Sequence, residues 1–79
     1  MEVIVGKTYR HFKNKLYQVI AIAYDSESNN DENLRKMVVY KALYGDNKIW
    51  VRDYNMFISK VDKDKYPLVE QEYRFELID

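Results

Sequence analysis

The chain has 79 residues, including 13 basic and 13 acidic side chains, a single histidine and no cysteine. A chain this short can bury only one small core, and it has no disulfide or cysteine-ligated metal to reinforce that core. Zero net charge removes the bulk signature of proteins that bind nucleic acid mainly through phosphates, so nucleic acid ranks behind other partners.

The beginning of the chain, Met1 to Lys7, lacks the basic and long apolar regions of a secretory signal. The longest apolar run, Val19 to Tyr24, is far shorter than the roughly 18 residues that a membrane span needs. We therefore predict a cytoplasmic protein that forms one domain over residues 1–79 and has no membrane partner.

The first two predicted strands form a hairpin. Thr8 to Phe12 places Tyr9 and His11 on one face and Arg10 and Phe12 on the other. Strict alternation in the second strand, Leu16 to Tyr24, places Tyr17, Val19, Ala21 and Ala23 on one face and Leu16, Ile20 and Ile22 on the other. Because both faces are apolar, we expect a curled sheet, the C-terminal tail or a second chain to cover the second face.

Residues 25–35 are polar and acidic, which predicts a mobile hairpin loop. The segments that follow this loop are two strands, Lys36 to Ala42 and Lys48 to Arg52, a helical turn, Asp53 to Phe57, capped by Asp53, and a brief strand, Ile58 to Val61.

Residues 62–79 are predicted to be a C-terminal extension. Within it, Tyr73, Phe75 and Leu77 alternate with polar residues, as in an additional strand. Short strands in meander order, with a one-turn helix before the last, favour a mostly β fold: a small SH3-like barrel of about five strands.

Several motifs occur in a characteristic order. They are Tyr9-Arg10-His11-Phe12-Lys13, Tyr17-x-Val19, Ser26-Glu27-Ser28, Val38-Val39-Tyr40-x-Ala42-Leu43-Tyr44-Gly45-Asp46, Trp50-Val51-Arg52 and Met56-Phe57. Between about Gly6 and Val61 the chain resembles the bacterial and phage family known as domain of unknown function 1653. The resemblance implies a compact, β-rich protein of about this length, and it implies no general activity.

This sequence departs from the family pattern at three places. Asp25 stands where the family usually has histidine, Asp53 stands where it usually has proline, and the loop after Ser28 is longer. A family function that relied on that histidine or on that loop would be in doubt for this chain.

His11 is the first candidate for a functional role, together with Tyr9 and Arg10. A single imidazole without a cysteine or serine partner pattern makes a poor catalytic site. A structural, hydrogen-bonding histidine is therefore the favoured interpretation, and neither a catalytic residue nor a metal site is predicted.

Trp50 and Arg52 form the second candidate, because alternation places them on the same strand face. An indole and a guanidinium together suit a planar anionic ligand, by stacking and by paired hydrogen bonds. The alternative is that Trp50 belongs to the core and that Arg52 forms an ion pair with Asp46 or Asp53.

Tyr40 and Tyr44 form the third candidate, since their hydroxyls need partners if buried and can face a ligand if exposed. In the turn that precedes the predicted strand from Lys48 to Arg52, Gly45 is expected to adopt a positive φ. Asp46 is expected to hydrogen-bond to the backbone of this turn. The acidic loop lacks the glycine and the final glutamate of a calcium-binding loop, so no calcium site is predicted.

These candidates favour a non-catalytic module that binds a small anionic or aromatic ligand, such as a nucleotide, without a cofactor. The predicted ligand-binding residues are Tyr9, Arg10, His11, Tyr40, Tyr44, Trp50 and Arg52. The alternative is protein–protein interaction or homo-oligomerisation through the second apolar face or an unpaired sheet edge. Nucleic-acid binding ranks third, and an enzyme is the least favoured class.

Overall fold

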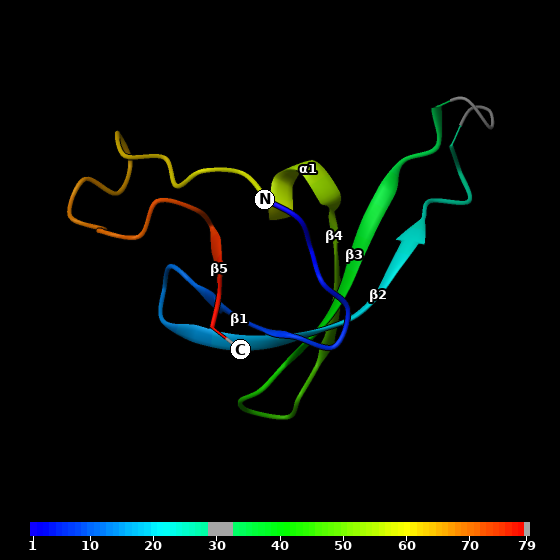
Figure 1. Cartoon of the computed structure of the whole chain (residues 1–79), viewed down its shortest axis with the longest axis horizontal. Helices are drawn as coiled ribbons and strands as arrows, with labels where there is room; N and C mark the ends of the chain where they lie inside the picture. The colour runs from blue at the N-terminus through cyan, green and yellow to red at the C-terminus, as the bar shows by residue number, and fades with distance from the viewer. Residues whose placement is uncertain (29–32, 79) are drawn as a thin grey trace.

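The structure is a computed structural model and describes residues 1–28 and 33–78. Its elements are β1 (Thr8–His11), β2 (Lys15–Tyr24), β3 (Lys36–Ala42), β4 (Ile49–Asp53), α1 (Tyr54–Phe57) and β5 (Phe75–Leu77). All five strands form one antiparallel sheet in the order β4-β3-β2-β1-β5 (Figure 1). None of the described helices is long and apolar enough to cross a membrane.

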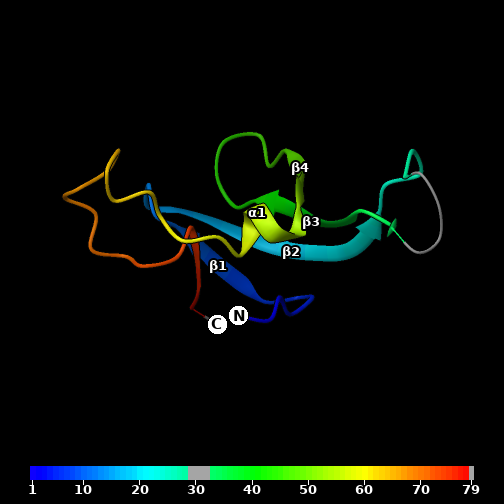
Figure 2. The same ribbon diagram turned by 90° about the horizontal axis from the view of Figure 1, so that it is seen from above.

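The prediction of a mostly β domain of five strands with a short helix before the last strand is confirmed. The sheet curves, but its end strands β4 and β5 do not pair with each other (Figure 2). The barrel is therefore open, and SH3-like describes it only approximately.

The predicted strand from Ile58 to Val61 is wrong. In this segment only Lys60 makes an isolated bridge, to Tyr73. Ile58 packs against the core and Val61 is buried, while Lys60 between them is exposed. Inward residues three positions apart do not fit the two-residue period of a strand. The fifth strand is instead β5 in the C-terminal tail, which pairs with β1.

Asp53 caps α1, as predicted. Its carboxylate accepts a hydrogen bond from the Met56 backbone N–H at 3.2 Å and from Arg35 Nε at 3.1 Å. The hydrogen bond from Arg35 and the Met56 amide hold the pKa of Asp53 below its usual value. The loop predicted over residues 25–35 begins with an Asp25 turn, but residues 29–32 lie outside the described part of the chain.

A bulge in β2 changes which side chains face the core. Tyr17 and Val19 lie opposite Ala42 and Tyr40 of β3, but after Ile20 the register shifts. From there Ile22 lies opposite the buried Val38 and packs against the core. The predicted faces of Ala21, Ile22 and Ala23 are therefore wrong, since a single inserted residue reverses the alternation.

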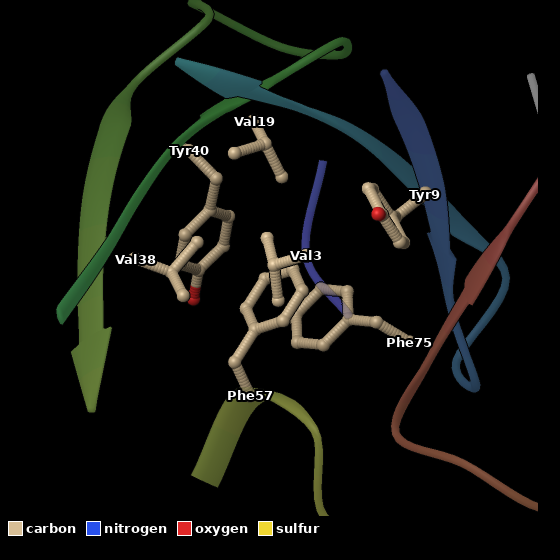
Figure 3. Packing of buried hydrophobic residues seen from close by; sticks show 7 residues of the cluster. All are labelled: Val3, Tyr9, Val19, Val38, Tyr40, Phe57 and Phe75. Carbon is tan, nitrogen blue, oxygen red and sulfur yellow. The ribbon is translucent and has the colours of Figure 1, made fainter. Parts of the chain in front are cut away.

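The core is built around two stacked phenylalanines. Phe57 from α1 and Phe75 from β5 lie with their ring centroids 3.9 Å apart and their planes 4° apart. Tyr9 and Tyr40 pack edge-on against Phe57, at 5.7 and 5.3 Å (Figure 3). The remaining members of this cluster are Val3, Val19 and Val38. A one-turn helix and a three-residue strand thus supply the centre of the core.

The hydroxyl of the fully buried Tyr9 anchors the N-terminal segment, because it accepts a hydrogen bond from the Ile4 backbone N–H at 2.9 Å. Tyr9→Phe leaves that amide without its partner, so we expect the free energy of unfolding to fall by about 1–2 kcal/mol. Urea denaturation would measure the loss. Tyr24→Phe is the control, since Tyr24 is 58% exposed. An equal effect of both substitutions would contradict the anchoring role.

Candidate anion-binding pocket

A pocket of about 290 Å³ lies where the end of β1 and the following turn meet β4 and the C-terminal tail. Its lining residues are His11, Phe12, Lys13, Arg52, Val61, Asp62, Lys65, Tyr66 and Arg74. Four of these side chains are cationic and only one is a carboxylate. The chain as a whole has no net charge, so the positive charge at this pocket is local.

Arg52 projects from the inner face of β4, where it lies opposite Val38 of β3. Its Nε donates a hydrogen bond to the Tyr40 hydroxyl at 3.1 Å, and its Cζ lies 5.8 Å from the centre of the Phe75 ring. The core therefore fixes the position of this guanidinium through neutral groups.

The ion pair proposed as an alternative role for Arg52 is not formed. Asp46 pairs with Lys48 at 3.0 Å, and Asp53 pairs with Arg35 at 3.1 Å. Trp50 does not belong to the core either, since it is 47% exposed. Both parts of that alternative are wrong.

Arg74 places a second guanidinium at the same pocket. Its Nε donates to the Ser59 hydroxyl at 3.1 Å, and its backbone carbonyl accepts from the Phe12 N–H at 3.0 Å. Burial, followed by the positive charge of Arg52, lowers the pKa of Arg74. Within residues 1–28 and 33–78, neither Arg52 nor Arg74 forms an ion pair with a carboxylate.

His11 lies between the core and the pocket. Its ring stacks on Phe12 at 4.4 Å and meets the edge of Phe75 at 5.0 Å. Burial first, and then the charges of Arg52, Arg74 and Lys13, lower the pKa of His11 to about 4. Its Nδ1 accepts a hydrogen bond from the Lys13 backbone N–H at 3.1 Å. In the neutral ring the proton is therefore on Nε2, which is a hydrogen-bond donor.

The lowered pKa of His11 predicts a pH-dependent stability. Between pH 6.5 and about 4 the unfolded chain binds a proton at this imidazole and the folded protein does not. Acidification through this range therefore favours unfolding. We expect the urea midpoint to fall more from pH 7 to pH 5 in the wild type than in His11→Gln. Equal falls in the two proteins would contradict this assignment.

Aromatic rings form part of the pocket wall. The rings of Phe12 and Tyr66 lie 4.9 Å apart at 59°, and Lys13 Nζ is 5.7 Å from the centre of the Tyr66 ring. The carboxylate of Asp62 accepts hydrogen bonds from the backbone N–H groups of Asp64 and Lys65 at 3.0 and 3.3 Å. The one carboxylate of the pocket is thus engaged in its own turn.

Of the seven predicted ligand-binding residues, His11 and Arg52 line this pocket. Tyr40 is buried behind it and orients Arg52 through its hydroxyl. Tyr9 belongs to the core. Arg10 projects to the opposite sheet face, as predicted, where it pairs with Glu76 at 3.0 Å.

Tyr44 and Trp50 lie outside the pocket lining. Tyr44 shares a hydrogen bond of 2.6 Å with the Tyr17 hydroxyl, and burial followed by this hydrogen bond raises the pKa of Tyr17. In the adjoining turn Gly45 has a φ of 59°, as predicted. The turn is closed by Asn47, whose side chain donates to the Ala42 carbonyl at 2.9 Å, and not by Asp46 as expected.

The pocket residues that the sequence did not indicate come mainly from the tail. Arg74 lies between Tyr73 and Phe75, and alternation alone could place it away from the core but not beside Arg52. Lys65 belongs to a charged segment with the pattern of an ordinary exposed turn. Only the return of the tail to β1 brings these residues to His11.

A second pocket, of about 370 Å³, is lined by Met1, Glu72, Tyr73, Phe75, Glu76 and Leu77. It contains two carboxylates and none of the predicted ligand-binding residues. No group of three or more potential metal ligands occurs among the described residues. The cationic pocket is therefore the site at which the chemistry indicated by the sequence converges.

Comparison with known proteins identifies a family for this chain. Residues 7–77 match the family model described as protein of unknown function DUF1653, and no curated protein and no solved structure matches the chain. The match includes the tail that supplies Arg74, beyond the Gly6 to Val61 range of the resemblance in the sequence. The chain belongs to the DUF1653 family of proteins of unknown function.

Proposed function

We propose that this protein is a non-catalytic binding module that holds a small anionic ligand with a planar ring, such as a nucleotide, in the pocket between β1, β4 and the tail. The observation that carries the proposal is the pair of guanidiniums, Arg52 and Arg74, which line one pocket without a carboxylate partner among the described residues.

An anion would relieve an unfavourable charge arrangement. Two guanidiniums and the nearby Lys13 repel one another, and their combined field adds to the effect of burial in lowering the pKa of His11. A phosphate or carboxylate offers several acceptor oxygens to these donors, and hydrogen bonds between charged groups are the stronger kind. The same anion would raise the pKa of His11, so acidification should strengthen binding.

The aromatic wall supports a ligand with a planar part. Phe12 and Tyr66 lie beside the cationic groups, and base–aromatic stacking contributes about 1–3 kcal/mol per base. The pocket volume of about 290 Å³ is near the lower limit of small-molecule sites. A mononucleotide or a smaller aromatic acid suits this size better than a polymer does.

The proposal is tested by titrating the ¹⁵N-labelled protein with inorganic phosphate, adenosine and adenosine monophosphate at pH 6 and pH 7.5. We expect phosphate and the nucleotide to shift the amide signals around Phe12, Arg52 and Arg74, the nucleotide at lower concentration than phosphate. We expect adenosine to have little effect. Binding of adenosine as tight as that of the nucleotide, or no shift at these amides with either anion, would overturn the proposal.

A further inference from the structure

β4 is one of the two edges of the sheet, because among residues 1–28 and 33–78 it pairs only with β3. Three consecutive apolar residues on this strand are exposed: Ile49 by 64%, Trp50 by 47% and Val51 by 59%. Neither a proline, a charged residue nor a bulge interrupts this run, and these are the usual means of protecting an edge. The opposite edge, β5, is only three residues long and contains Glu76.

The hydrogen-bond pattern shows which backbone groups of β4 face outward. The Ala42 N–H donates to the Lys48 carbonyl at 2.9 Å, so Lys48 and, by alternation, Trp50 and Arg52 bond to β3. The N–H and C=O groups of Ile49 and Val51 therefore point away from the sheet. Within the described part of the chain, these four groups have no hydrogen-bond partner.

We propose that two copies of this chain pair antiparallel through their β4 edges, with a twofold axis at Val51. In this register Val51 faces Val51 of the second copy, and the two residues exchange both backbone hydrogen bonds. Ile49, whose backbone groups also point outward, then faces Asp53. Trp50 faces Arg52 of the second copy as a non-hydrogen-bonded pair, in which side chains lie closest.

Charge selects this register over its neighbours. A slip that sets Trp50 opposite itself would place Lys48 opposite Arg52, and a slip in the other direction would set Arg52 opposite itself. Like charges directly opposite each other are unfavourable in a sheet. The register with Val51 opposite itself avoids both like-charge contacts. It instead places Trp50 of each copy opposite Arg52 of the other, and an indole beside a guanidinium-bearing side chain is a favourable pair.

In the same register, apolar side chains on the outer face of one sheet meet apolar side chains on the outer face of the other. Ala21, Val39 and Val51 lie opposite one another on β2, β3 and β4. Pairing at Val51 joins this row to its copy, so an apolar row would continue without interruption across both sheets. Burial of the exposed Val51 side chain adds hydrophobic stabilisation to the backbone hydrogen bonds.

A cysteine scan provides a test, because the chain has no cysteine of its own. Hydrogen-bonded partners in an antiparallel pair have Cα atoms roughly 5.5 Å apart, within the range that a disulfide spans. We expect Val51→Cys to form a disulfide-linked dimer on the order of tenfold or more faster than Leu68→Cys, because pairing raises the effective thiol concentration. Leu68 is 94% exposed and lies outside the sheet, which makes it the matched control.

Two further measurements test for the dimer in proteins without an introduced cysteine. Sedimentation of the wild type should show a monomer–dimer equilibrium that Val51→Lys shifts to monomer and Leu68→Lys does not. The emission of Trp50, the single tryptophan, should shift to shorter wavelength as concentration rises. A wild type that stays monomeric at millimolar concentration, or Trp50→Cys cross-linking faster than Val51→Cys, would overturn the proposed dimer. Val51 and Leu68 both lie outside the lining of the cationic pocket, so neither substitution removes a side chain that the proposed ligand would contact.

Discussion

Phe57→Ala is expected to remove most of the stability of this protein. Phe57 is fully buried, and its ring stacks on Phe75 at 3.9 Å and contacts the rings of Tyr9 and Tyr40. Removing a buried phenylalanine side chain typically costs about 3–5 kcal/mol, and the total stability of a small domain is about 5–15 kcal/mol. Urea denaturation followed by circular dichroism would show a strongly lowered midpoint or a chain already unfolded in buffer.

Met56→Ala is the matched control for this substitution. Met56 precedes Phe57 in the same one-turn helix but is 49% exposed. Substitutions at such surface positions usually change the free energy of unfolding by no more than about 0.5 kcal/mol. A Phe57→Ala protein with the urea midpoint of Met56→Ala would show that the two stacked rings are not the centre of the core.

Arg52→Gln and Arg74→Gln are each expected to weaken binding of anions at least about tenfold. A hydrogen bond to a charged group contributes about 1.5–3 kcal/mol, and each 1.4 kcal/mol corresponds to a factor of ten in the dissociation constant. Arg10→Gln is the control, since it removes the same charge from the opposite sheet face, where Arg10 pairs with Glu76. Isothermal titration with phosphate and adenosine monophosphate would measure the three variants.

The stability of the ligand-free variants separates a binding role from a structural one. The guanidinium of Arg74 is close enough to Arg52 for that charge to contribute to its lowered pKa. Removing one of two repelling charges should leave the urea midpoint of Arg74→Gln unchanged or raise it. Weakened anion binding in Arg10→Gln to the same extent, or a large loss of stability in Arg74→Gln, would contradict a binding role for this guanidinium pair.

Much of the secondary structure could be read from local patterns. The strand from Lys36 to Ala42 has the predicted bounds, and the cap at Asp53 and the positive φ of Gly45 are as expected. These features depend on side-chain alternation, on a carboxylate next to free amides and on backbone sterics, which act over only a few residues. The two clear errors in assigning the sheet, at β2 and at Ile58 to Val61, occur where tertiary packing breaks the two-residue alternation.

The candidate site could be predicted only in part. His11 and Arg52 carry the imidazole and a guanidinium of the type that suits an anion, and both line the pocket. Trp50 was an equally reasonable choice on the same strand face, but it lies two residues earlier on β4, opposite Tyr40, and outside the pocket lining. Sequence alternation assigns a face of a strand, whereas a pocket depends also on which distant segment packs beside each position along that strand.

The sequence by itself determined a mostly β fold, its main strands, its capped helical turn and the presence of aromatic and guanidinium groups. Only the tertiary structure decided that Arg74 joins Arg52 and His11, because β5 pairs with β1 across more than sixty residues of intervening chain. It likewise decided that β4 is an open edge. Both outcomes depend on contacts between distant segments, and local residue patterns carry no information about which distant segments will meet.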